Sequence, residues 1–466
     1  MQTLQNYLVV AVSWAAALSG NGLSARPESA QSSVQFKTIY RFTAGDGSGG
    51  YDSDLVSDRN GGFFATTEQG GDAACYSPLG CGTVYHLSPP SSPGGAWTKT
   101  TIYIFTGYPN DGQTPSGPLV IALNGTLYGV TESGGNGACT YGATVPIGCG
   151  TVYSLTPPAE SGGAWTETVL YNFTGGSDGY SPDNVITGSD GVLYGVTSAG
   201  ASSGCFDYFG CGTVFSLTPP DTPGGAWTSS VLYTVEGSFF SGPATSLIIG
   251  PNQALYGTIG AGTDPCEMNL CGTVFSLAPP ATPGGAWTQA VLHNFTGLPG
   301  DGDSPNAGLA MGPSGEIYGT TYLGEGHPCG QPQVGCGTVF ELTPPASPGG
   351  DWTETILLTF PGAPAAGEPV AGVAIGKNGV LYGSTRYGGQ AGCLEHAGCG
   401  VVFALAPPVS PGGTWTETIL HHFTGGADGG EPVMTPVIGK DGALYGTTGY
   451  HRGEANNGTV FVIRNP

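Results

Sequence analysis

Residues 204–228 read GCFDYFGCGTVFSLTPPDTPGGAWT, and variants of this stretch occur six times in the chain. Each copy holds two cysteines, a Gly-Thr-Val-Phe or closely related run, a double proline and a Gly-Gly-x-Trp-Thr element. The tryptophans of that element recur about every 60 to 68 residues, at Trp97, Trp165, Trp227, Trp287, Trp352 and Trp415. A fixed period of this length indicates a solenoid, a propeller or an array of repeats.

Two further recurring motifs raise the number of copies of the repeat to seven. A Leu/Ile-Tyr-Gly triplet contains Tyr128, Tyr194, Tyr256, Tyr318, Tyr382 and Tyr445, and Phe64 holds the same place earlier. The Gly-Thr-Val-Tyr/Phe run starts at Gly82, Gly150, Gly212, Gly272, Gly337 and Gly458, with Gly-Val-Val-Phe from Gly400. The repeating unit is therefore about 60 residues long.

Each unit contains four strand-like runs. In residues 117–174 these runs cover 118–123, 126–131, 150–156 and 165–173. An Asn-Gly pair separates the first two runs and is a strong hairpin signal. The cysteine-containing loop separates the second run from the third, and the proline and glycine pairs separate the third from the fourth. Four short antiparallel strands in each of seven units are typical of a β-propeller.

The two ends of the repeat region are complementary. Residues 34–43 resemble a fourth strand that precedes any first strand, and the last unit stops after its third strand at 458–463. Pairing these two segments would complete the seventh unit and remove both open sheet edges. The sequence therefore predicts an all-β, seven-bladed β-propeller in residues 34–466, closed by its N-terminal strand.

The composition agrees with this fold and narrows the partners. The chain has 85 Gly, 38 Pro and 10% aromatic residues, which favours short strands joined by many turns. Its formal net charge is −23, and such an acidic chain repels phosphate backbones. Nucleic-acid binding is therefore excluded, whereas divalent cations and extracellular glycans or proteins remain as candidate partners.

The N-terminal segment predicts export. Residues 1–25 carry no charge, and residues 8–18 form an apolar run that is too short to span a bilayer. We interpret 1–25 as a signal peptide and 26–33 as a linker, although the basic residue usual at its start is missing. A membrane anchor is the alternative. We expect a secreted or extracellular monomer without a membrane span, in the periplasm or at the cell surface if it is not released.

Twelve cysteines form six close pairs. An even count, local pairing and an export signal together favour disulfides over free thiols. Zinc sites are the alternative, but each pair lacks the second pair of ligands that such a site needs. The predicted disulfides are Cys75–Cys81, Cys139–Cys149, Cys205–Cys211, Cys266–Cys271, Cys329–Cys336 and Cys393–Cys399.

The repeat also resembles a known family. The text at 443–448, ALYGTT, and at 419–429, ILHHFTGGADG, is similar to the GloVer (Gloeo-Verruco) tandem repeat of secreted bacterial choice-of-anchor proteins. The resemblance covers nearly all of residues 34–466 and recurs seven times. It implies an exported bacterial protein but no particular activity.

The cysteine loops predict a binding face, because they place varied residues on a constant frame. Aromatic rings in or beside these loops would stack on sugars, or they would instead cover the disulfides. The candidates are Tyr76, Tyr141, Phe206, Tyr208, Phe209, Tyr322, Tyr387 and Tyr450.

A second group of candidates is titratable and belongs to units five to seven. Such residues would support general acid–base work if they converged, as in a polysaccharide lyase or glycosidase. No nucleophile motif, metal cluster or fixed carboxylate spacing accompanies them. They are Glu325, His327, Arg386, Tyr387, Glu395, His396, His451 and Arg452.

Asp-Gly pairs recur in the connections between units, on the same expected face as the cysteine loops. Asp301 and Asp303 form the richest of these, and their carboxylates make calcium the one ion that the sequence suggests. The alternative is that Asp-Gly simply forms turns. No other cofactor is indicated.

These observations favour a non-enzymatic, exported protein that binds or adheres through its loop face, with a glycan or cell-wall polymer as the expected ligand. A structural surface protein without a ligand is the first alternative. An extracellular carbohydrate-active enzyme is the second.

Overall fold

The computed structural model describes residues 33–466 with gaps at 44–45, 47–53, 73, 76–78, 93, 142–144, 161, 202–210, 223, 236–245, 261–270, 283, 298–299, 325–334, 348, 363–364, 390–392, 394–397, 411 and 450–457. Residues Val34–Pro466 form one compact unit. The predicted signal peptide lies outside the described residues. Within them, no helix has the length and apolar character that crossing a membrane would require.

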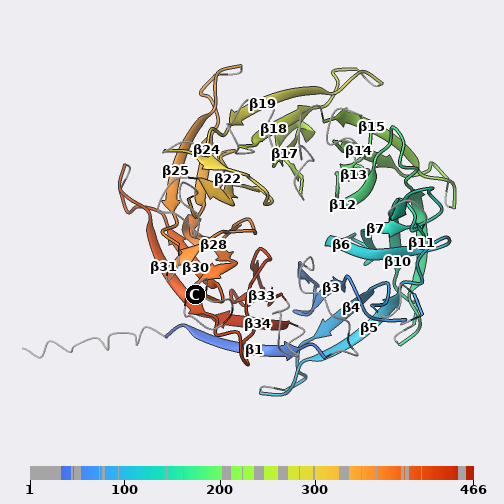
Figure 1. Cartoon of the computed structure of the whole chain (residues 1–466), viewed down its shortest axis with the longest axis horizontal. Helices are drawn as coiled ribbons and strands as arrows, with labels where there is room; N and C mark the ends of the chain where they lie inside the picture. The colour runs from blue at the N-terminus through green and yellow to red at the C-terminus, as the bar shows by residue number, and fades with distance from the viewer. Residues whose placement is uncertain are drawn as a thin grey trace, which may run out of the picture. The chain divides into compact units, whose positions relative to one another are not determined.

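Seven antiparallel sheets of four strands stand in a ring, which confirms the predicted seven-bladed propeller (Figure 1). We number the blades in chain order, so that blade 1 contains β2–β5. The innermost first strands are β2 (Val56–Ser57), β6 (Gly112–Ile121), β12 (Tyr180–Thr187), β16 (Ile248–Ile249), β21 (Ala310–Met311), β27 (Ala374–Ile375) and β32 (Val437–Ile438). The second strands are β3 (Phe63–Thr67), β7 (Leu127–Gly134), β13 (Leu193–Ala199), β17 (Leu255–Ile259), β22 (Ile317–Thr321), β28 (Leu381–Thr385) and β33 (Leu444–Thr448).

The third and fourth strands complete each blade towards the outside. The third strands are β4 (Thr83–Ser88), β10 (Thr151–Thr156), β14 (Thr213–Thr218), β18 (Thr273–Ala278), β24 (Thr338–Thr343), β30 (Val401–Ala406) and β34 (Thr459–Arg464). The fourth strands are β5 (Thr98–Ile104), β11 (Thr166–Asn172), β15 (Thr228–Thr234), β19 (Thr288–Asn294), β25 (Thr353–Thr359), β31 (Thr416–His422) and β1 (Gln35–Arg41).

A few short elements lie outside the seven four-stranded sheets. Two single-turn 3-10 helices, η1 (Pro251–Gln253) and η2 (Lys377–Gly379), lie between first and second strands. Three two-stranded ladders join β8 (Thr140–Tyr141) to β9 (Val145–Pro146), β20 (Gly302–Asp303) to β23 (Leu323–Gly324), and β26 (Ala366–Gly367) to β29 (Tyr387–Gly388).

The ring closes as the sequence predicts. Strand β1 pairs antiparallel with β34, from Gln35 opposite Arg464 to Arg41 opposite Thr459. Blade 7 therefore consists of the last three strands of the chain and the first one (Figure 1). This pairing removes the open edge that β34 would otherwise present.

The first strand of blade 2 differs from its predicted bounds. The expected run starts at Pro118, whereas β6 starts at Gly112 and passes through Pro115. A proline lacks the N–H that a central strand needs, but β6 is an edge strand of its sheet. A register shift between Ser116 and Val120 accommodates the proline-containing segment.

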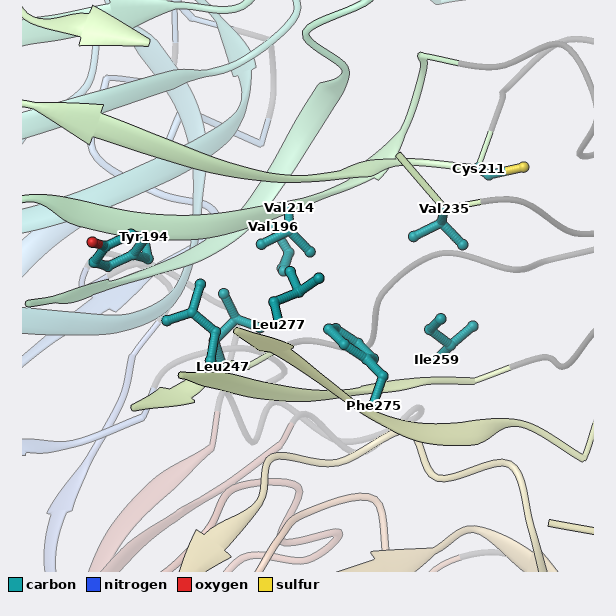
Figure 2. Packing of buried hydrophobic residues seen from close by; sticks show 10 residues of the cluster. Tyr194, Val196, Cys211, Val214, Val235, Leu247, Ile259, Phe275 and Leu277 are labelled. Atoms are coloured by element: carbon teal, nitrogen blue, oxygen red, sulfur yellow. The ribbon is translucent and has the colours of Figure 1, made fainter. Parts of the chain in front are cut away.

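The core lies between neighbouring blades. Figure 2 shows Val196 and Val214 of blade 3 facing Phe275 and Leu277 of blade 4, all of them fully buried. The third-strand aromatic packs edge-on against the Phe that follows the fourth strand of the preceding blade, as Phe215 does against Phe173. The same contact joins Tyr85 to Phe42, Tyr153 to Phe105, Phe340 to Phe295, Phe403 to Phe360 and Phe461 to Phe423.

The repeated tryptophan forms a second contact between blades. The Trp of one blade packs edge-on against the Tyr of the Leu-Tyr-Gly triplet in the blade before it. For example, Trp287 lies 5.8 Å from Tyr194 between ring centroids. In the stretch quoted above, Phe215 and Trp227 both pack on blade 2, whereas Val214 packs on blade 4. The stretch therefore contacts both neighbouring blades, which is why it recurs in almost every blade.

Disulfides staple the loops between second and third strands. The pairs Cys75–Cys81, Cys139–Cys149 and Cys393–Cys399 are bonded as predicted. Cys211, Cys271 and Cys336 are also disulfide-bonded, and their predicted partners Cys205, Cys266 and Cys329 lie outside the described residues.

Candidate functional site

A central channel passes between the innermost strands and has a volume of about 400 Å³. Every blade contributes to its lining. The lining residues are Asp54, Ser116, Gly117, Pro118, Glu132, Asp183, Ser246, Ala307, Gly308, Leu309, Val370, Ala371, Gly372, Val373, Arg386, Val433, Met434 and Thr435.

The charges in this lining are unevenly distributed. Asp54, Glu132 and Asp183 belong to blades 1 to 3, whereas Arg386 belongs to blade 6 and is the one cation among the lining residues. The channel therefore has an acidic side and a side that carries the Arg386 guanidinium. Such convergent polar groups in a concave site are typical of small-molecule or oligomer binding.

Arg386 belongs to a polar cluster that spans three blades at one end of the channel. Its Nε donates to Glu431 Oε2 of blade 7 over 3.2 Å, and its guanidinium lies 5.1 Å from the centre of the Tyr387 ring. Tyr322 of blade 5 donates from its hydroxyl to Glu368 Oε2 of blade 6 over 2.6 Å. We call these five residues the mouth cluster.

Backbone hydrogen bonds within each blade connect the side-chain contacts of the mouth cluster. Tyr322 N–H donates to Ser304 O, Arg386 N–H to Glu368 O, and Gly449 N–H to Glu431 O. Blades 5, 6 and 7 are thereby linked by alternating side-chain and backbone contacts. Burial, followed by the bond to Glu368, raises the pKa of Tyr322, so its hydroxyl stays a proton donor at neutral pH.

The disulfide loops hold the two glutamates of this cluster. Glu368 N–H donates to Cys336 O over 2.7 Å, and Glu431 N–H donates to Cys399 O over 2.8 Å. Both glutamates have a positive φ, +55° and +52°, which an L-residue adopts only when its surroundings impose it. The disulfide frame therefore positions the mouth cluster.

The Asp-Gly connections have a capping role in the described blades. Asp178 Oδ2 accepts from Thr174 N–H over 2.8 Å and from the Tyr171 hydroxyl over 3.0 Å. In the other blades with this pair, the Asp likewise accepts from the N–H of the Thr that follows the fourth strand. These pairs are Asp46 with Thr43, Asp111 with Thr106, Asp301 with Thr296 and Asp428 with Thr424. These bonds fasten the end of each fourth strand to the turn after it.

The two calcium candidates differ in their surroundings. Asp301 takes part in the capping just described, and its hydrogen bonds outweigh burial and lower its pKa. Asp303 is buried, accepts from Ser304 Oγ over 2.7 Å, and has its pKa raised by burial. Calcium binding by this pair stays a prediction.

Only part of the predicted site can be placed. The structure brings Tyr322, Arg386 and Tyr387 to the mouth cluster, and it describes the backbone of Tyr141 in β8. The remaining candidates lie outside the described residues: Tyr76, Phe206, Tyr208, Phe209, Glu325, His327, Glu395, His396, Tyr450, His451 and Arg452.

Sequence reasoning missed Glu368 and Glu431, together with the three channel carboxylates. A signal was present, because a residue followed by proline recurs at the start of the blades as Thr114-Pro115, Ser181-Pro182 and Ser304-Pro305. Blades 6 and 7 replace these small hydroxyl residues by Glu. This change to a charged residue at one repeated position would have identified blades 6 and 7 as the blades that contribute to the site.

Comparison with solved structures finds partial similarity to distant proteins. The PQQ domain of a pyranose dehydrogenase from Coprinopsis cinerea, in its holo form, is 14% identical, with a TM-score of 0.40 over 75% of this chain and 92% of that one. A luciferin-regenerating enzyme is 11% identical, with a TM-score of 0.40 over 75% of this chain and 88% of that one. No curated protein matches the chain in sequence.

One family model matches the chain along most of its length. It is the Gloeobacter/Verrucomicrobia repeat, and it matches residues 17–204, 77–333 and 329–465. The matched segments cover all seven blades and agree with the resemblance noted in the sequence. The chain therefore belongs to the Gloeobacter/Verrucomicrobia repeat family.

Proposed function

We propose that this chain is an exported, non-enzymatic binding protein that holds a polysaccharide at the mouth cluster. The observation that carries the proposal is the convergence of Arg386, its partner Glu431 and two tyrosines at one end of the central channel. The strand 2–3 loops with their disulfides emerge on the same face. A rigid, cross-linked mouth is suited to an extracellular ligand.

The chemistry of the mouth cluster supports a sugar. A guanidinium donates to sugar hydroxyls or ring oxygens, carboxylates accept from hydroxyls, and tyrosine rings pack on the apolar faces of sugars. The acidic side of the channel, with Asp54, Glu132 and Asp183, disfavours a polyanionic ligand. A neutral glycan of the cell wall or matrix is therefore the expected ligand class.

The test uses the oxidised chain from residue 26 onward. It is incubated with a panel of insoluble and soluble polysaccharides, with calcium or with chelator, and retention and released product are scored together. We expect retention on at least one neutral polysaccharide without new reducing ends. Loss of retention under chelator would add an ion requirement, and released product would support the carbohydrate-active enzyme instead.

Two arginine variants locate the binding face. Arg386→Gln removes the charge but keeps a donor for buried Glu431, and we expect at least tenfold weaker retention because a charged hydrogen bond contributes about 1.5–3 kcal/mol. Arg59→Gln is the matched control, since Arg59 lies in the turn between β2 and β3, on the opposite face. Equal retention by both variants would contradict the proposed site.

A further inference from the structure

The boundary between blades 4 and 5 brings one imidazole and two carboxylates together. His293 lies near the end of β19, Asp301 follows in the connection to blade 5, and Glu354 lies near the start of β25. One ligand atom from each residue lies within 4.8 Å of the other two. The Nε2 atom of His293 is 3.4 Å from Asp301 Oδ1 and 3.8 Å from Glu354 Oε2.

The contact between His293 Nε2 and Asp301 Oδ1 is a long hydrogen bond whose length also suits two ligands of one metal ion, and Glu354 Oε2 lies slightly farther away. Ligand atoms about 2.0–2.2 Å from a tetrahedral ion lie about 3.3–3.6 Å from one another. An N–H···O hydrogen bond is usually about 2.7–3.2 Å long. At the matching place between blades 6 and 7, the His421 Nε2 atom lies 3.1 Å from Asp428 Oδ2, which is an ordinary hydrogen bond.

The other blade boundaries provide an internal comparison. Strand register identifies three equivalent positions at each boundary. The first lies on the fourth strand, opposite the Val of the third strand, and the second is the Asp of the Asp-Gly pair. The third lies on the fourth strand of the next blade, opposite the Leu of its third strand. Among the described boundaries, only that between blades 4 and 5 combines His, Asp and Glu there. The other complete sets are Tyr40, Asp46 and Lys99; Tyr103, Asp111 and Glu167; Tyr171, Asp178 and Ser229; and His421, Asp428 and Phe36.

We propose that His293, Asp301 and Glu354 bind one divalent transition-metal ion, with Zn²⁺ as the best match. Imidazole nitrogen with carboxylate oxygen suits zinc, whereas calcium takes six to eight oxygen ligands. The three side chains are 20%, 13% and 12% exposed, so an ion and a completing water can reach them. The site is separate from the mouth cluster and does not depend on polysaccharide binding.

The surroundings of Asp301 prepare it as a ligand. Its Oδ2 atom accepts from Thr296 N–H and Thr296 Oγ1, each over 2.7 Å, and its Oδ1 atom accepts from Gly302 N–H over 2.7 Å. These bonds fix the carboxylate and leave a lone pair of Oδ1 directed at His293. Such hydrogen bonds from outer residues orient metal ligands and sharpen their geometry.

The chain itself offers variants that should fold. Blade 2 has a tyrosine, Tyr171, at the position equivalent to His293. Blade 4 has a glutamine, Gln289, at the position equivalent to Glu354. His293→Tyr and Glu354→Gln therefore each remove one ligand while placing a residue that this fold already carries there. His421→Tyr is the matched control, because its His–Asp pair has Phe36 in the third position.

The experiment titrates Zn²⁺ and Co²⁺ into the chelator-treated mature protein and records stoichiometry, cobalt absorption and melting temperature. We expect the wild type and His421→Tyr to bind one more equivalent than His293→Tyr or Glu354→Gln, or to bind it at least tenfold more tightly. Zinc should raise the melting temperature only where that equivalent binds. No uptake by the wild type, unchanged uptake by both variants, or an equal loss in His421→Tyr would each overturn the proposal.

Discussion

Glu167 shows how a single buried carboxyl at a blade boundary affects stability. It belongs to blade 2, beside Asp111, and its Oε1 atom has no hydrogen-bond partner among the described residues. Burial, with a smaller contribution from the Asp111 charge, raises the pKa of Glu167 from 4.5 to about 7. The folded chain therefore keeps a proton here that the unfolded chain has already lost between these two pH values.

The pH dependence follows from that difference. A raised carboxyl pKa gives stability that is fully present below about pH 4.5 and is lost as the pH rises to about 7. Glu167→Gln carries no charge at any pH. We expect it to match the wild type in free energy of unfolding at pH 4.5 and to exceed it by about 1 kcal/mol at pH 8, after allowance for solvent screening. Denaturant melts at both pH values measure this, with exposed Glu160→Gln as the control, and a variant less stable than the wild type at pH 8 would be inconsistent with it.

Gly195 shows why the Leu-Tyr-Gly triplet ends in glycine. A Cβ atom there would lie 2.5 Å from Phe215 Cζ on the neighbouring strand and equally close to Asn184 O. We expect Gly195→Ala to destabilise the fold by about 1–3 kcal/mol, because the aromatic ring must move within a packed core. Gly176→Ala is the control, since its nearest neighbour, Thr174 Oγ1, is 3.4 Å away. Equal thermal melts for the two variants would count against this packing.

At the scale of the elements, each disulfide has a local and a functional effect. Closing loops of this length stabilises the fold by about 2–3 kcal/mol. Replacing Cys393 and Cys399 by serine should lower the melting temperature and also weaken polysaccharide retention, because Cys399 O holds Glu431. Replacing Cys139 and Cys149 should lower the melting temperature alone.

The paired comparison separates the two effects. Both serine variants are measured by thermal unfolding and by retention at a temperature where each is folded. Weakened retention in both variants would mean that the disulfides act through general stability and not through the mouth cluster.

The strands were predictable from sequence to a greater extent than the site. Hairpin signals and alternating apolar residues gave the third and fourth strands within a residue or two, as with 150–156 against β10. The first strand of blade 2 was missed by six residues, because Pro115 is tolerated at an edge. The mouth cluster depends on which loop residues meet across blades, and local sequence carries no information on such distances. His293 is absent from the sequence candidates for the same reason, since Glu354 is distant in sequence.

At the scale of the whole molecule, ring closure makes the N-terminal strand essential. A chain that begins at residue 44 lacks β1 and leaves the edge of β34 unpaired, with Phe36 no longer packed on Phe461 and His421. We expect this truncation to aggregate or to lose the cooperative melt, because an exposed edge strand pairs with other chains. A chain that begins at residue 34 should remain monomeric and fold normally. Light scattering with thermal melts compares them, and a stable monomer from residue 44 would contradict the closure.

The most direct test of the account is hydrogen–deuterium exchange of the mature protein with and without the polysaccharide that retains it. We predict slower exchange in peptides that contain Tyr322, Arg386 and Glu431, and no change in the turns of the opposite face, such as that at Asn124. Protection confined to the outer fourth strands or to those opposite turns would contradict binding at the mouth cluster.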